Sequence, residues 1–157
     1  MSLVQRITSD MKEALKSKDQ LRLSVLRMAK AAVQNYVISK RTSGQSQPAD
    51  DLNDDGVITV LSSMIKQRQE SVDIYRTHGD EKKASQEEAE VAILREYMPS
   101  QLGDDELKKL VEEAIAEANA SSPKEMGLVM KALMPKVKGK ADGKRVSEAV
   151  KKYLVQR

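Results

Sequence analysis

The chain contains no cysteine, no phenylalanine and no tryptophan. The absence of cysteine excludes disulfides, thiolate metal sites, iron–sulfur clusters and a cysteine nucleophile. Four tyrosines are the whole aromatic complement and glycine occurs seven times in 157 residues, whereas 32% of the residues are charged. A composition so poor in aromatic and turn-forming residues favours amphipathic helices over a β-rich core.

Long apolar runs are also missing. No run reaches the roughly 18 residues that a membrane-spanning helix needs, and residues 1–15 alternate charged and apolar side chains too evenly for a signal peptide. We therefore expect a soluble, cytoplasmic protein that has no membrane partner.

Apolar residues recur at helical spacing along the whole chain. Before Pro99 the spacing predicts four helices, which begin at about Val4, after a cap at Asp19, at about Gly56 and at a Ser85 capping box. The polar segment Arg41–Asp51 predicts a flexible loop.

The segment Met98–Asp105 predicts a domain boundary, because proline and glycine interrupt the helical pattern there. Beyond it the predicted helices are shorter. One of them starts at Ser122–Pro123, ends at Pro135, and contains Gly127 as a point of close helix approach. The sequence thus predicts an all-α fold, with an N-terminal bundle of long helices in residues 1–97 and a compact domain of short helices with a basic loop in residues 98–157.

Charge is segregated in the second part. Residues 1–97 hold fifteen basic and fifteen acidic side chains, but residues 131–152 hold eight bases against only Asp142 and Glu148. A local excess of this size can steer a polyanion. The alternative is a solvated basic loop in which Asp142 caps the next helix. The candidate RNA-binding residues are Lys131, Lys136, Lys138, Lys140, Gly143, Lys144 and Arg145, and Gly143 is included for positive φ or close approach of a phosphate.

Motifs for metals, nucleotides and catalysis are incomplete. Residues 51–58 (DLNDDGVI) resemble the start of an EF-hand loop, but Ser62 stands where the bidentate glutamate is required. Residues 139–145 (GKADGKR) are one residue short of a nucleotide-binding P-loop and lack its Ser/Thr. With His78 as the only histidine and no cysteine, no triad or multi-histidine metal site can be assembled. We therefore expect no enzymatic activity, no metal and no cofactor.

Four segments closely resemble the YqeY-like family: residues 18–35, 65–75, 87–102 and 121–146. The strings PSQL and MPKVKGKADGK are the most specific, and the resemblance runs from about Val4 to Leu154. The chain departs from the family pattern at residues 79–82 (GDEK) and at residues 127–130 (GLVM), where one lysine is lost. The family is similar to the helical tail domain of the B subunit of tRNA-dependent amidotransferases, the GatB/YqeY domain.

The resemblance implies an all-α, two-part fold and a non-catalytic RNA-binding accessory module. In the amidotransferase the tail domain helps to hold the tRNA body, so the expected partner is tRNA, another structured RNA or a tRNA-containing complex. A carbon–nitrogen ligase activity with glutamine as amido-N-donor would belong to the larger enzyme. The alternative is a helical protein–protein interaction module without RNA binding, whose partner would dock on Met126, Met130 and Met134, although these methionines are also spaced as a core stripe.

Overall fold

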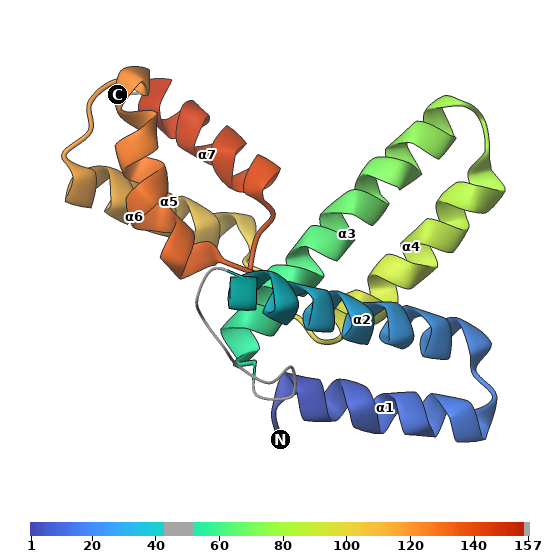
Figure 1. Cartoon of the computed structure of the whole chain (residues 1–157). Helices are drawn as coiled ribbons and strands as arrows, with labels where there is room; N and C mark the ends of the chain where they lie inside the picture. Colours follow the sequence, from blue (N-terminus) through green and yellow to red (C-terminus); the bar gives the residue numbers. More distant parts are fainter. Residues whose placement is uncertain (43–51, 156–157) are drawn as a thin grey trace. The chain divides into compact units, whose positions relative to one another are not determined.

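The computed structural model describes residues 1–42 and 52–155. Within these ranges the secondary structure is helical and contains no β-strand (Figure 1), which confirms the predicted all-α class. Contacts divide the chain into two compact units, Met1–Met98 (unit 1) and Pro99–Arg157 (unit 2). The loop predicted at Arg41–Asp51 lies outside the described residues from residue 43 onward.

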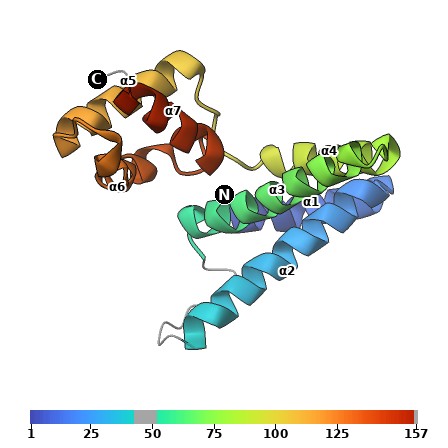
Figure 2. The same cartoon turned by 90° about the horizontal axis from the view of Figure 1, so that it is seen from above.

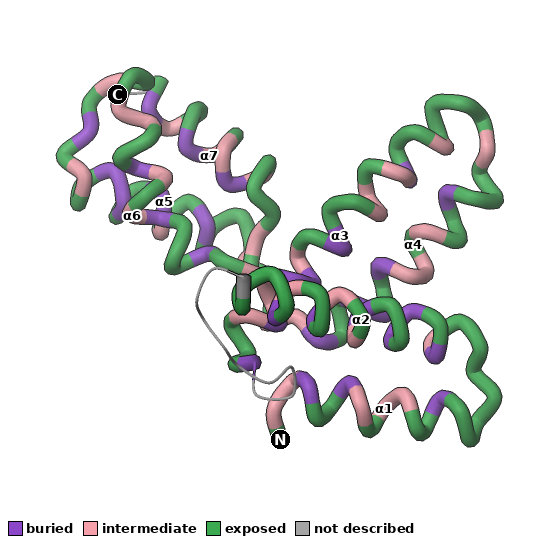
Figure 3. Tube along the Cα trace, viewed as in Figure 1, coloured by how far each residue is buried: buried purple, intermediate pink, exposed green. Residues whose placement is uncertain are grey.

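The described residues of unit 1 form four helices: α1 (Leu3–Ser17), α2 (Gln20–Thr42), α3 (Asp54–Thr77) and α4 (Glu81–Arg95). Helices α1 and α2 form one pair, and α3 and α4 form another (Figure 1). Seen from above, the C-terminal end of α2 diverges from α3 (Figure 2). Each helix buries one face (Figure 3), and the core includes Ile7, Leu26, Leu61 and Leu94, each 2% exposed or less.

The N-terminal cap of α2 lies where the sequence predicts it, because Asp19 Oδ1 accepts the N–H of Arg22 at 3.1 Å. The predicted start of α4 at Ser85 is wrong. A tight turn at Gly79 (φ 76°) brings Asp80 into the capping position, where its carboxylate accepts the N–H of Lys83 at 3.1 Å. The N-terminal cap therefore lies five residues earlier than the Ser85 motif predicts.

The first turn of α3 explains the acidic run that resembles a calcium loop. Asn53 caps the helix by accepting the N–H of Gly56 at 2.9 Å, and Asp54 accepts the N–H of Leu3 at 2.9 Å. Asp55 also lies in this first turn, where negative charge complements the helix dipole. Asp51, the first residue of the calcium-like pattern, lies outside the described residues.

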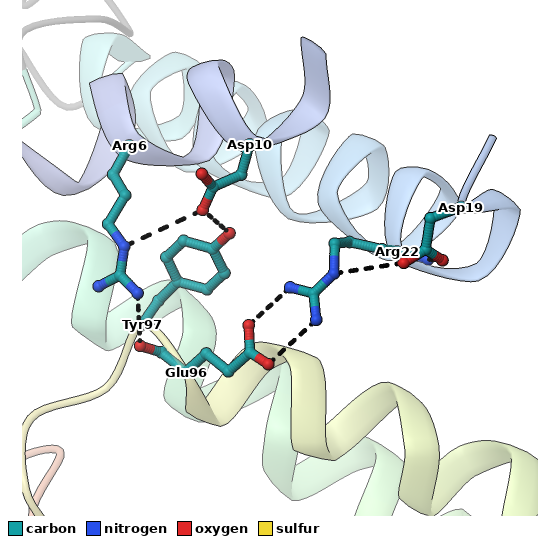
Figure 4. Close-up of polar contacts among 6 residues, drawn as sticks. All are labelled: Arg6, Asp10, Asp19, Arg22, Glu96 and Tyr97. Carbon is teal, nitrogen blue, oxygen red and sulfur yellow. Dashed lines mark hydrogen bonds and ion pairs between the residues drawn. The ribbon is translucent and has the colours of Figure 1, made fainter. Parts of the chain in front are cut away.

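A polar clamp ties the end of α4 to α1 and α2 (Figure 4). Tyr97 is 2% exposed, and its hydroxyl donates to the carboxylate of Asp10 at 2.5 Å. The guanidinium of Arg6 lies 4.7 Å from the centre of the tyrosine ring. Arg22 donates two hydrogen bonds to Glu96, at 2.6 and 3.1 Å. These hydrogen bonds lower the pKa of Glu96, so its charged form stabilises the folded state.

We expect Arg22→Gln to lower the free energy of unfolding at pH 7 by about 1 kcal/mol, because both partners are partly exposed and water screens the pair. A depressed folded-state pKa gives stability that is present above the ordinary glutamate pKa and lost as the pH falls through the folded value. The difference between wild type and variant should therefore shrink as the pH drops below about 5. Urea unfolding at several pH values measures it, and a pH-independent difference would contradict the assignment.

Unit 2 contains α5 (Asp104–Ala118), a 3₁₀ turn η2 (Pro123–Glu125), α6 (Met126–Val137) and α7 (Gly143–Val155). The three α-helices bury one face each in a shared core. Its fully buried or nearly fully buried side chains include Leu107, Val111, Ile115, Val129, Leu133, Val146, Val150 and Leu154.

Helix α6 differs from the sequence prediction in two places. It continues through Pro135 to Val137, where the sequence predicts a stop. The N–H of Lys138 still reaches the carbonyl of Met134 at 3.0 Å, so the helical hydrogen bonds resume one turn after the proline. The predicted close approach at Gly127 is wrong, because a Cβ there would find no atom within 4 Å.

Candidate nucleic-acid interface

The basic loop, residues 138–142, connects α6 to α7 through a tight turn. The N–H of Lys140 donates to the carbonyl of Val137 at 2.8 Å, and the N–H of Ala141 reaches the same carbonyl at 3.2 Å. Gly139 adopts φ 75°, a left-handed conformation that favours glycine. The path of the loop is therefore fixed by its own backbone.

The segment before α5 holds this loop in place. The side-chain amide of Gln101 donates to the carbonyl of Gly139 at 2.9 Å, and the N–H of Leu102 donates to the carbonyl of Lys140 at 2.8 Å. Two loop carbonyls thus have partners 38 residues away in the chain, while the side chains of Lys138 and Lys140 stay exposed. Sequence reasoning gave Gln101 no role, and the only signal available was its place in the PSQL string.

Arg145 serves the fold of unit 2. Its guanidinium donates to the carbonyl of Leu102 at 2.7 Å and to the carboxylate of Asp104 at 2.7 Å. Lys136 is also engaged, because its ammonium lies 3.1 Å from the carboxylate of Glu117. Two of the predicted RNA-binding residues therefore have acidic partners inside unit 2, which reduces the charge that they offer to a ligand.

The other four predicted cations are exposed and without an ion pair or side-chain hydrogen bond among the residues that the structure describes. Three of them fall within seven residues, since Lys138 and Lys140 lie in the loop and Lys144 in the first turn of α7. Lys131 lies seven residues before Lys138, about two helical turns along α6. We call these four residues the lysine cluster: Lys131, Lys138, Lys140 and Lys144.

Gly143 is the first residue of α7, and its backbone is not left-handed. A Cβ at this position would meet no atom within 4 Å. The expectation of a positive φ at Gly143 is therefore wrong, and within the loop it applies to Gly139 instead. Asp142 caps α7 as the alternative reading of the loop predicts, by accepting the N–H of Arg145 at 2.8 Å. Because this carboxylate stands at the helix N-terminus, attraction of a phosphate depends on the lysine cluster.

These two glycines give a paired prediction. We expect Gly139→Ala to lower the free energy of unfolding by about 1–2 kcal/mol, because an L-residue is strained in the left-handed region. Gly143→Ala should cause no loss, since the added methyl group has open space in a helical residue. Denaturant unfolding of both variants measures the difference, and equal stability of the two would contradict the loop geometry.

The three methionines of α6 do not share one environment. Met126 and Met130 are half-buried against the core of unit 2, as a core stripe requires. Met134 is 39% exposed, and Leu128 on the same helix is 58% exposed. An apolar docking surface on α6 would therefore depend on Leu128 and Met134.

The described ranges, 1–42 and 52–155, offer no support for a metal site or a membrane-spanning helix. No group of three or more His, Cys, Asp or Glu residues there could hold a metal ion. None of the helices in these ranges combines the length and the apolar character needed to cross a bilayer. His78 forms the C-terminal cap of α3, where its Nδ1 lies 2.8 Å from the carbonyl of Ile74.

The chain is thus an all-α protein of two helical units, the second of which carries a lysine-rich loop. The family model described as Yqey-like protein matches residues 4–154, so the chain belongs to this family, as the sequence resemblance predicts. A similar protein occurs in Pyrenophora tritici-repentis (strain Pt-1C-BFP), where it is named Altered inheritance of mitochondria protein 41, mitochondrial. It is 26% identical over 153 residues, which cover 95% of this chain and 79% of the relative.

Proposed function

We propose that this chain is a non-catalytic RNA-binding accessory module that contacts tRNA, or a complex containing tRNA, through the lysine cluster. The observation that carries the proposal is a set of four exposed lysines that have no ion pair among the described residues, three of them in or next to a loop whose backbone is fixed by hydrogen bonds. A fixed loop presents its charges without the entropic cost of ordering a flexible segment on binding.

The chemistry of the lysine cluster suits phosphates better than bases. Lysine ammonium groups act as point charges on phosphate oxygens, and such contacts position an RNA without reading its sequence. Stacking on bases would need an open aromatic ring. The one tyrosine of unit 2, Tyr153, has Lys108 and Lys152 at 5.6 and 5.9 Å from its ring centre. We therefore expect recognition of RNA shape, with weak sequence preference and strong salt dependence.

The relation to tRNA-dependent amidotransferases is part of this proposal. The chain would share the RNA-holding role of the tail domain, and the ligase chemistry would stay with the other domains of that enzyme. The cytoplasmic location remains a prediction from the sequence, and the name of the relative places that protein in mitochondria.

A second candidate function is a protein–protein interaction module without RNA binding. The observation that favours it is the exposed apolar pair on α6, Leu128 at 58% and Met134 at 39%. A partner that buries either side chain would bind with little dependence on salt.

In-cell crosslinking separates the two functions in one purification. RNA crosslinked to the chain is sequenced, and proteins from the same purified complex are identified by mass spectrometry. The proposed function predicts enrichment of tRNA that is lost when the lysine cluster is neutralised. A salt-resistant protein partner with no RNA enrichment would reject it in favour of the interaction module.

A further inference from the structure

The charged residues of helix α2 are all basic, although residues 1–97 as a whole contain equal numbers of basic and acidic residues. Its 23 residues include five basic side chains and no acidic one. Arg22 is bound to Glu96 and therefore belongs to the clamp of unit 1. The other four are Arg27, Lys30, Lys40 and Arg41, all of them beyond the first turn.

The outward face of α2 is mostly polar or small, with Ile38 (55% exposed) and Met28 (40% exposed) as its large apolar side chains. Positions 24, 27, 28, 31, 34, 35 and 38 are exposed, and their spacing places them on one side of a helix. The opposite side is closed, because Leu26, Ala29, Val33 and Val37 are each 3% exposed or less. We call the exposed set the α2 face: Ser24, Arg27, Met28, Ala31, Gln34, Asn35 and Ile38.

Among the described residues, no acid pairs with Arg27 or Lys30. Arg27 is the cation of the α2 face and is exposed, Lys30 lies next to the face and is partly buried, and neither has an ion pair with a residue that the structure describes. No acid of α2 itself lies beside them, since the helix contains none. A cationic surface is thus left available for an external anion.

The polar side chains of the α2 face match the sugar–phosphate backbone of a nucleic acid. Arginine binds phosphate oxygens in a bidentate manner, and serine, asparagine and glutamine supply further hydrogen bonds to phosphate and sugar. Ala31 lies between them, and its small side chain allows the helix axis to approach the nucleic acid closely. An anionic membrane fits less well, because an interfacial helix needs a broad free apolar face, whereas Met28 and Ile38 are isolated among the polar and small residues of the α2 face.

We propose that the α2 face is a second RNA-contact surface, carried by unit 1, that binds the RNA backbone in addition to the lysine cluster of unit 2. This inference rests on the proposed function and extends it to a bipartite contact. Two surfaces on one chain raise the overall affinity for a single long RNA, provided that both can engage it at once.

Site-specific crosslinking tests the α2 face directly, because the chain has no cysteine of its own. Ala31→Cys places one thiol on the α2 face, and Ala92→Cys places one on an exposed position of α4 as the matched control. Each variant is labelled with an azidophenacyl group and irradiated with purified bulk tRNA. We expect crosslinking at position 31 to exceed that at position 92 by several-fold. Equal yields, or none at position 31 while tRNA is retained, would overturn the inference.

Charge removal separates this surface from the loop. In the double variant Arg27→Gln/Lys30→Gln, the slope of log affinity against log salt concentration should become shallower by about 1.5–2. Each lost phosphate contact accounts for roughly 0.9 of that change. The control is Lys66→Gln with Lys82→Gln, which removes the same charge from exposed positions on α3 and α4.

The outcomes are distinct for the two claims. If loss of the loop lysines weakens binding while the α2 variant equals its control, the α2 face is rejected and the proposed function stands. If wild type retains no tRNA, both fail. A third outcome is that wild type, but not the α2 variant, adsorbs to anionic phospholipid vesicles and that position 31 does not crosslink to tRNA. This outcome would assign the surface to a membrane and overturn the inference.

Discussion

Replacing Lys138, Lys140 and Lys144 together by glutamine should weaken tRNA binding by up to about two orders of magnitude at 0.1 M salt. Each lysine that meets a phosphate releases condensed counterions, so three lost contacts remove up to about three units of slope from a log–log salt plot. The loss should be nearly uniform across tRNA species, because phosphate contacts carry no sequence information. Filter binding with several purified tRNAs measures both quantities.

The matched control removes three charges from α1 and its C-cap. Lys12, Lys16 and Lys18 are exposed, and their replacement by glutamine changes the net charge by the same amount. This control should bind tRNA nearly as wild type does, and the stability of both triple variants should change little, since exposed charges contribute about 0–1 kcal/mol per pair. Equal losses of affinity in the two variants would mean diffuse electrostatic attraction and would remove the loop as a site.

Leu133→Ala should lower the free energy of unfolding of unit 2 by about 2–5 kcal/mol. Leu133 is fully buried in the core beneath α6, so truncation removes apolar contacts and leaves a cavity. Leu128→Ala on the same helix should change the free energy of unfolding by less than about 0.5 kcal/mol, because Leu128 is 58% exposed. Denaturant unfolding of both variants provides the comparison, and similar losses would contradict the placement of α6.

The same pair separates the two candidate functions. Leu128→Ala keeps the fold and every lysine, so the proposed function expects it to bind tRNA as wild type does. A protein-interaction module that docks on the exposed face of α6 would instead lose affinity for its partner, because exposed interface leucine side chains contribute through apolar burial.

The helices could be predicted from the sequence because burial follows a local repeat. Leu26, Ala29 and Val33 recur on one side of α2, and all three are buried in the core as that spacing predicts. The start of α4 could not be chosen in the same way, since Asp80 and Ser85 are both good caps. The turn at Gly79 decides between them, and its left-handed conformation depends on how α3 and α4 pack.

The candidate site was only partly predictable. Clustering of lysines is visible in the sequence, but the acids that engage Lys136 and Arg145 lie 19 and 41 residues away. The contact of Gln101 with the loop spans 38 residues. Such pairings are set by the packing of α5 against α6 and α7, which residue spacing does not encode. The purely basic character of α2 was hidden for a different reason. The net charge of residues 1–97 is zero because the acidic residues of the other segments offset the basic residues of α2.

The salt dependence of tRNA binding by the wild-type chain tests the central claim most directly. Purified protein at micromolar concentration is titrated against bulk tRNA over a series of salt concentrations. Four phosphate contacts from Lys131, Lys138, Lys140 and Lys144 predict a log–log slope of about −3 to −4, and a steeper one if the α2 face also binds. Absence of binding at low salt, or a slope near zero, would contradict the account.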